Sequence, residues 1–212
     1  MQLEQARSAL RLTPDQVSGT VRITSTDTCM HGLITPALRS LATVHPLLEY
    51  ELHAGNELSS LTRREADIAV RATIRPPQHL VGKRIGPIRM ALYAGKASGI
   101  RYKDVEAGKA VWIAPDDTLP EHPSVLWRKR HYPRAVPRYR VSSLLTVMEM
   151  VAAGMGVGIL PVFLARIRKD LVALTGPLED CHAELWLLTH PESRHLRRVS
   201  TVFLHLGEWI KL

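Results

Sequence analysis

The sequence predicts an α/β protein of two lobes, and three observations indicate this fold class. Between residues 19 and 70, short apolar strands alternate with amphipathic helices. Strands connected in this way pair in parallel through right-handed crossovers. A second series of strands and helices begins after Gly86 and Pro87. Within it, residues 148–161 join a helix end, three glycines and a short buried strand.

The first lobe begins with a strand over residues 20–24, which leads into the polar run 25–28. A helix over 33–44 follows, because its apolar residues recur at every third or fourth position. Pro36 fits only the first turn of that helix. The later predicted elements of this lobe are a strand over 47–52, a turn at Gly55 and Asn56, a helix over 58–64 and a buried strand over 67–70.

The second lobe is expected to begin at Gly86 and Pro87, which separate predicted strands over 80–85 and 89–93. Its further elements are a strand over 111–113, a helix over 122–131, a strand over 139–141, a helix up to Gly154 and an inner strand over 157–160. A helix over 162–168 should carry the chain back to the first lobe. The last elements are strands over 171–174 and 184–189 and a terminal helix with an apolar stripe of Leu196, Val199, Phe203, Leu206 and Ile210.

Three segments are therefore expected. The first lobe holds residues 19–86 and 164–212, and the second lobe holds residues 87–163. Residues 1–18 are the third segment, and within them residues 2–12 form a helical pattern that is too short to be stable alone.

Three glycines determine the local structure that is predicted for residues 148–161. Gly154 stands where a helix needs a left-handed C-cap, which a residue with a Cβ resists. Gly156 and Gly158 permit close backbone approach, and Pro161 suits the first turn of the next helix. Taken alone, this pattern fits a helix–turn–strand unit of any α/β protein.

In its wider context, the same stretch resembles the effector-binding domain of LysR-type transcriptional regulators. The matching pattern is Val141, Ser142 and Ser143 at the start of a helix, followed by the glycine-rich stretch from Val151 to Pro161. Further matches, in the right order, are residues 19–23 for the first strand, 33–38 and 44–46 for the first helix and its exit, and 65–71 for the third strand. The resemblance covers nearly the whole chain from Gly19 onward.

This resemblance implies two Rossmann-like lobes with a hinge and a central cleft, the type 2 periplasmic-binding-protein-like fold. It implies a non-enzymatic domain that binds a small-molecule effector, possesses no cofactor and forms a homodimer or tetramer. Residues 1–18 resemble the remnant of a linker helix, so DNA binding would belong to an N-terminal winged helix-turn-helix outside this chain. A natural stand-alone domain is the alternative. The rival functions are a transport-type solute-binding protein and an enzyme on the same fold.

Three stretches are expected at the carboxyl ends of strands, where backbone donors at helix N-termini can face a ligand. By resemblance, Thr28, Ser142 and Ser143 bind the effector. Weaker candidates beside them are Thr26, Asp27, Cys29, Arg71 and Ala72. The structural alternatives are that Thr28 and Ser142 only cap helices and that Arg71 pairs with a surface acid.

Asp27 places a carboxylate at a position where an anionic effector would prefer hydroxyl groups. If its carboxylate faces the cleft, a plain carboxylate effector is repelled, and a zwitterionic or cationic ligand fits better. If Asp27 instead caps the helix near Gly32 or pairs with Arg71, the cleft accepts a carboxylate, and we favour this second arrangement.

Composition narrows the function classes. The chain has no apolar run long enough for a membrane span, and its first ten residues lack the apolar core of a secretory signal, which indicates a cytoplasmic protein. Cys29 and Cys181 are the only cysteines, so they indicate neither a disulfide framework nor a zinc site, although a redox pair stays open. No nucleophile elbow, phosphate loop or metal-binding helix pair appears, and the ten histidines are scattered.

The net charge of +8 is concentrated in residues 128–140, which hold six Lys or Arg and no acid. Such a run with tyrosines can contact nucleic acid. Pro133 and Pro137 break it into turns, however, and no basic helix fits, so a solvated surface loop is the favoured interpretation.

Overall fold

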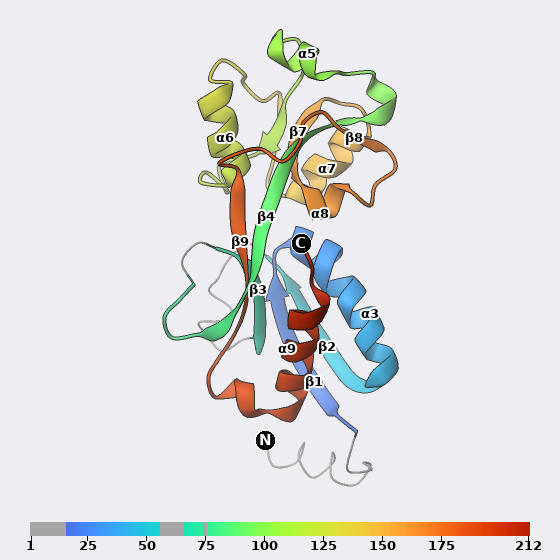
Figure 1. The fold of residues 1–212 in the computed structure, drawn as a ribbon, viewed down its shortest axis with the longest axis vertical. Helices are drawn as coiled ribbons and strands as arrows, with labels where there is room; N and C mark the ends of the chain where they lie inside the picture. The colour runs from blue at the N-terminus through green and yellow to red at the C-terminus, as the bar shows by residue number, and fades with distance from the viewer. Residues whose placement is uncertain (1–15, 56–65, 74–75) are drawn as a thin grey trace. The chain divides into compact units, whose positions relative to one another are not determined.

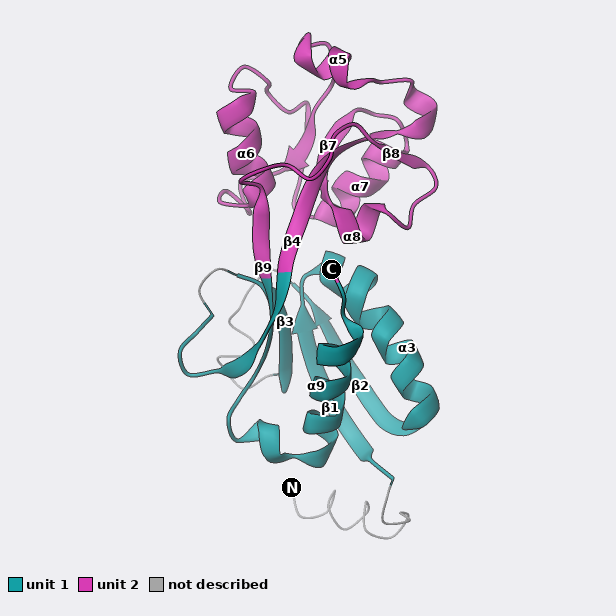
Figure 2. Ribbon diagram, viewed as in Figure 1, with its two compact units in different colours: residues 1–86, 185–211 teal, residues 87–184, 212 magenta. Residues whose placement is uncertain are grey.

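The computed structural model describes residues 16–55, 66–73 and 76–212. The chain divides into two compact units, coloured separately in Figure 2. Unit 1 holds Met1–Gly86 and Leu185–Lys211, and unit 2 holds Pro87–Glu184. The helical pattern predicted over residues 2–12 and the predicted helix over 58–64 both lie wholly outside the described residues.

Unit 1 contains a sheet in which β1 (Ser18–Ser25) lies between β2 (Leu47–Ala54) and β3 (Ile68–Ala72). Both pairings of β1 are parallel, which confirms the prediction from alternating strands and helices. β3 also pairs with β9 (His182–Thr189) in antiparallel orientation. The first three residues of β3 are fully buried, because an inner strand is covered on both faces.

Helices α3 (Thr35–Val44) and α9 (Arg197–Trp209) pack against each other in unit 1 (Figure 1). The ring Nε2 of His205 on α9 lies 3.0 Å from the Ser40 hydroxyl and 2.9 Å from the Ala37 carbonyl on α3. The predicted stripe of α9 is only partly correct. Val199, Leu206 and Ile210 are buried, but Leu196 is exposed and Val202 is fully buried instead.

The helix after β1 begins earlier than the sequence predicted. The helical course starts with α2 (Asp27–Cys29) and passes through a π-helical turn, Met30–Ile34, before α3. The Thr35 N–H reaches back to the Met30 carbonyl, one residue further than in an α-helix. Pro36 stands at the start of α3 and has no N–H to donate, so the wider turn lets the helix continue past it.

Strand β4 (Val81–Gly95) is one continuous strand, whereas the sequence predicted two strands separated at Gly86 and Pro87. Gly86 has a φ of 155°, a conformation that glycine adopts without a side-chain clash, so the strand passes through the pair. Both β4 and its neighbour β9 have residues in each unit (Figure 2).

The other strands of unit 2 are β7 (Val157–Pro161) and β8 (Leu171–Ala173), both antiparallel to β4, and the parallel pair β5 (Ile113–Pro115) and β6 (Tyr139–Val141). Its helices are η2 (Lys96–Ser98), α5 (Tyr102–Glu106), α6 (Pro123–His131), α7 (Leu144–Ala152) and α8 (Val162–Ala165). No helix in the described part of the chain combines the length and apolar character that a membrane crossing requires.

The return from unit 2 to unit 1 occurs between Glu184 and Leu185, so the predicted boundary at residue 164 is wrong. Residues after α8 pair with β4 and stay in unit 2. β8 joins β4 in antiparallel register, and the N–H of Leu174 donates to the Leu92 carbonyl at 2.8 Å. These main-chain bonds link segments about 80 residues apart, which local sequence patterns do not reveal.

The glycines of residues 148–161 behave largely as predicted. Gly154 follows α7 with a φ of 79°. A Cβ on Gly156 would collide with the backbone carbonyl of Val111, and one on Gly158 would lie 2.9 Å from side chains of α7. Pro161 ends β7 and precedes α8 rather than standing in its first turn, and α8 ends at Ala165 instead of residue 168.

Candidate functional site

Six of the predicted effector residues lie at the carboxyl ends of β1 and β3 in unit 1. The structure brings these residues, which we call the strand-end cluster, to one edge of the sheet because β1 and β3 are parallel neighbours. The cluster consists of Thr26, Asp27, Thr28, Cys29, Arg71 and Ala72. Beneath it, the buried Ser25 hydroxyl donates to the Val70 carbonyl at 2.7 Å, which joins the two strand ends.

Thr26, and not Thr28, caps the helix that follows β1. The Thr26 hydroxyl accepts a hydrogen bond from the Cys29 N–H at 3.3 Å and lies 3.1 Å from the Thr28 hydroxyl. Asp27 occupies the first turn of α2, where its carboxylate accepts from the Thr28 N–H at 2.6 Å. The expected cap by Asp27 near Gly32 does not form, because Gly32 lies inside the π-helical turn.

Cys29 is buried beneath these hydroxyl groups, with 2% of its surface exposed. Burial raises the pKa of its thiol, and this effect outweighs the hydrogen bonds from Thr26 and Thr28 and the positive charge of Arg71. Burial likewise raises the pKa of Cys181 to about 12. Both cysteines are free thiols. They are therefore held in the protonated form, which is the poor nucleophile.

Arg71 holds the strand ends together. Only 3% of the residue is exposed, and its guanidinium donates to the Gly55 carbonyl and, at 2.6 Å, to the Thr24 hydroxyl. Gly55 follows β2, and Thr24 lies on β1, so one side chain from β3 connects all three parallel strands. Burial lowers the pKa of Arg71. Ala72, the last residue of β3, is exposed.

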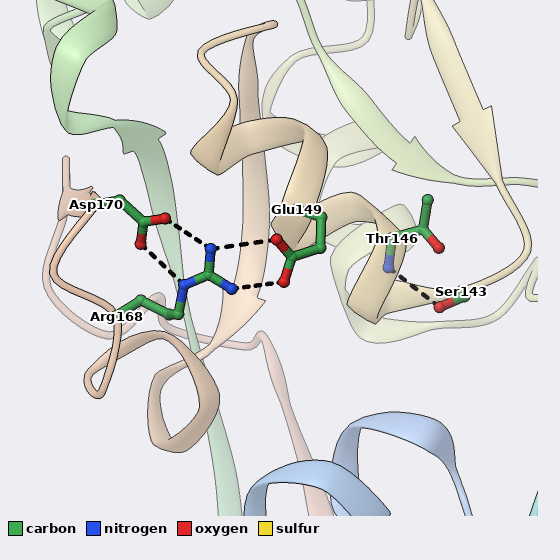
Figure 3. A network of polar contacts seen from close by, with 5 residues as sticks. All are labelled: Ser143, Thr146, Glu149, Arg168 and Asp170. Carbon is green, nitrogen blue, oxygen red and sulfur yellow. Dashed lines mark hydrogen bonds and ion pairs between the residues drawn. The ribbon is translucent and has the colours of Figure 1, made fainter.

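Ser142 and Ser143 lie in unit 2, at the amino end of α7. The Ser143 hydroxyl accepts a hydrogen bond from the Thr146 N–H at 3.2 Å, as Figure 3 shows. Ser143 is therefore the N-cap of α7, the role that the sequence gave to Ser142 as the structural alternative. Ser142 is exposed in the bend after β6, where its hydroxyl does not cap the helix.

An ionic network that the sequence did not predict connects α7 to the segment before β8 in unit 2. The Arg168 guanidinium lies 2.5 Å from Glu149 on α7 and 2.6 Å from Asp170, which precedes β8 (Figure 3). The two carboxylates raise the pKa of Arg168, and its guanidinium lowers the pKa of Asp170. Glu149 and Arg168 are 19 residues apart, so no helical spacing could have revealed their contact.

A metal centre is not indicated by the described residues, since no group of three His, Cys, Asp or Glu side chains could hold an ion there. The geometry instead offers hydroxyl groups at the strand ends and before α7, which suit a small polar ligand. The family model for the LysR substrate binding domain matches residues 14–211.

The chain belongs to the LysR substrate-binding domain family.

Two curated relatives of this LysR domain are transcriptional regulators. The Mau operon transcriptional activator of Paracoccus denitrificans is 26% identical over 201 residues, which are 92% of this chain and 66% of that protein. An HTH-type transcriptional regulator of Xanthomonas campestris pv. campestris (strain 8004) is 30% identical over 101 residues, or 48% of this chain and 29% of that protein. The LysR domain thus spans less than two thirds of both relatives.

Solved LysR-type structures share the fold. The regulatory domain of CrgA from Neisseria meningitidis aligns with a TM-score of 0.78 at 16% identity, over 91% of this chain and 98% of that chain. The reduced regulatory domain of OxyR2 from Vibrio vulnificus aligns with a TM-score of 0.70 at 17% identity, over 94% and 100%. The predicted α/β, type 2 periplasmic-binding-protein-like fold class is confirmed.

Proposed function

We propose that this LysR domain senses a small-molecule effector and thereby controls transcription through a winged helix-turn-helix in the same protein. The family match and the regulator relatives support this role. A non-enzymatic sensor also fits the described residues, whose two thiols are buried and protonated. The proposed location is the cytoplasm, because a transcription regulator of this kind must reach its DNA.

The observation that carries the proposal is the strand-end cluster. Thr26 and Thr28 place two hydroxyls 3.1 Å apart at the start of a helical segment. The carboxyl ends of parallel strands are the usual ligand site of α/β sheets. We propose that the strand-end cluster binds the effector in unit 1, with Thr26, Asp27 and Ala72 at the surface and the buried Thr28, Cys29 and Arg71 beneath them.

Ser142 and Ser143 are proposed as the effector-binding residues of unit 2. Ser142 is exposed, so its hydroxyl is available to a ligand. Ser143 already accepts the Thr146 N–H, and its part is to keep the start of α7 and its backbone donors in place.

Asp27 governs the charge of the effector. Its carboxylate accepts one short hydrogen bond from a backbone N–H, a local arrangement that offsets part of its charge. We therefore keep a small carboxylate as the proposed effector class, with Asp27 favouring a ligand that also carries an amine.

The test is a thermal-shift screen of the chain with small carboxylates, amines and amino acids. Asp27→Asn should increase the shift with plain carboxylates, while Thr26→Ala and Ser142→Ala should reduce every ligand shift. Thr43→Ala serves as the matched control, since Thr43 is an exposed residue of α3 remote from the cluster in sequence. If Asp27→Asn, Thr26→Ala and Ser142→Ala all respond like wild type to every ligand that shifts it, the site assignment is wrong.

A solute-binding protein is the second candidate, because it shares the fold. The regulator relatives favour the sensor. Measuring operator binding by the full-length regulator with and without a ligand from the screen separates the two. A solute-binding protein would show ligand binding with no effect on DNA.

A further inference from the structure

Residues 128–140 of unit 2, which we call the basic turn, form an ordered structure. Arg128, in the last turn of α6, is 7% exposed and donates to the Ala135 carbonyl. The Tyr132 N–H donates to the Arg128 carbonyl at 2.8 Å, and the Arg138 N–H donates to the Trp112 carbonyl at 3.0 Å. The sequence suggested a solvated loop. The structure instead anchors a surface turn at both ends.

The outer cations of the basic turn are not neutralised. Lys129, Arg134, Arg138 and Arg140 are exposed, and none of them makes an ion pair with any residue in the described ranges. Arg130 lies 4.0 Å from Asp180, but both side chains are mostly exposed, and such pairs contribute little. Burial lowers the pKa of Arg128, and the neighbouring charge of Arg140 lowers it further. The turn thus carries a concentrated positive charge, and the one ion pair that it makes among the described residues is the exposed contact of Arg130 with Asp180.

Aromatic rings next to the basic turn are used for packing. Trp127 stacks on His131 with ring centroids 4.1 Å apart, and it also contacts Tyr132 at 5.9 Å. Trp127 and Trp112 are only 8% and 4% exposed. Single-stranded nucleic acid is usually held by exposed rings that stack on its bases. These two indoles are too deeply buried to serve as such a platform, so the turn offers mainly charge.

We propose that the basic turn docks on the sugar–phosphate backbone of duplex DNA, as a contact additional to that of the helix-turn-helix. The proposal rests on the proposed function, which places this domain in a DNA-bound protein. Four of the five exposed cations are arginines, whose planar fork suits phosphate oxygens. A protein partner is less well matched, because protein interfaces have cores depleted of charge, and Val136 is the only large aliphatic residue in the turn.

The contact would be independent of base sequence, since phosphates position a protein without specifying a site. It would also be weak, because non-specific DNA affinities lie at about 1–100 µM at physiological salt. Within a full-length regulator already held on its operator, such a contact becomes intramolecular and so acts at a high effective concentration.

The test measures fluorescence anisotropy of a labelled duplex of arbitrary sequence with the chain over a salt series. The variant replaces Arg134, Arg138 and Arg140 by Ala. Its matched control replaces the exposed residues Lys96 in η2 and Arg166 and Lys169 after α8, and Figure 1 shows α8 and α6 as separate helices. Both variants lose three positive charges and keep Arg128, which anchors the turn.

Wild type should bind the duplex at about 50 mM salt, with affinity falling linearly on a log–log salt plot. The turn variant should bind at least about tenfold more weakly, and its slope should be smaller by about 2–3, one for each lost phosphate contact. The control should keep the wild-type slope.

Equal losses in the two variants, no duplex binding by wild type, or tighter binding to single strands than to duplex would each overturn the proposal. A turn variant that loses DNA binding but retains ligand shifts separates this proposal from the effector site. Failure of the effector screen with intact DNA binding would count against the proposed function alone.

Discussion

The guanidinium of Arg71 on β3 donates to the hydroxyl of Thr24 on β1 at a distance of 2.6 Å. Both residues are buried, and the same guanidinium donates to the Gly55 carbonyl after β2. A buried cation of this kind is stabilised by well-placed acceptors rather than by water. The Arg71 side chain therefore links the strands whose ends carry the strand-end cluster.

Replacing Arg71 by Met should lower the free energy of unfolding by about 3 kcal/mol, because the buried acceptors lose their charged donor. Urea denaturation measures this change. Arg89→Met is the control, since Arg89 is exposed on β4, and it should change stability by less than about 0.5 kcal/mol. An equally small effect at Arg71 would show that the strand ends do not depend on it.

The two serines before α7 should differ in their contribution to stability. Ser143→Ala removes the N-cap hydrogen bond to Thr146 and should cost about 1 kcal/mol. Ser142→Ala should cost less than about 0.5 kcal/mol, because Ser142 is exposed and does not cap the helix. Thermal unfolding of both variants tests this assignment. A larger loss of stability in Ser142→Ala than in Ser143→Ala would identify Ser142 as the N-cap.

Gly154 and Gly156 should respond differently to alanine. At Gly154 the nearest atom to a new Cβ is 3.6 Å away, so Gly154→Ala meets only the left-handed φ and should cost about 1 kcal/mol. At Gly156 the new Cβ would overlap the Val111 carbonyl, and the backbone would have to move. Gly156→Ala should therefore be clearly the more destabilising change in urea denaturation. Similar losses at both positions would contradict this packing.

His122 should make the protein acid-sensitive. Its ring Nδ1 accepts from the Ser124 N–H at 3.3 Å at the start of α6, and burial lowers its pKa to about 4. Because the ordinary His pKa is about 6.5, the unfolded chain takes up the proton first as pH falls. Stability should drop by about 3 kcal/mol between about pH 6.5 and pH 4 from this group alone.

His122→Asn tests this, since asparagine is also a good N-cap and does not titrate. The free energy of unfolding of the variant should fall less steeply between about pH 6.5 and pH 4 than that of wild type. His53→Asn, at an exposed position of β2, should keep the wild-type slope. Parallel pH profiles for wild type and His122→Asn would exclude His122 as the source of acid sensitivity.

The domain should self-associate through exposed apolar residues of unit 1. Val44, at the end of α3, is 67% exposed, and Leu47 and Leu52 on the outer strand β2 are 42% and 43% exposed. Exposed apolar side chains of this kind favour a contact between copies. Sedimentation at tens of micromolar should show a dimer or tetramer. Val44→Glu with Leu52→Lys should shift it toward monomer, whereas Leu126→Glu in unit 2 should not. A monomeric wild type would refute self-association.

The sequence by itself determined the features that depend on neighbouring residues. Gly154 marked the end of α7 because only glycine adopts its φ readily, and alternating strands and helices indicated the parallel order of β1, β2 and β3. The positions of Thr26, Thr28 and Arg71 after two parallel neighbours were enough to predict that they meet at one edge. These inferences needed only periodicity and connectivity.

The tertiary structure decided everything that depends on contacts between distant residues. The Arg71 bond to Thr24 spans 47 residues, the Arg168 bond to Glu149 spans 19, and the pairing of β8 with β4 moved the second boundary to Glu184. The same holds for the choice of Thr26 over Thr28, and of Ser143 over Ser142, as helix caps. A cap requires a particular backbone conformation and a hydroxyl within reach of one N–H, and closely spaced residues of the same type differ in that geometry but not in sequence pattern.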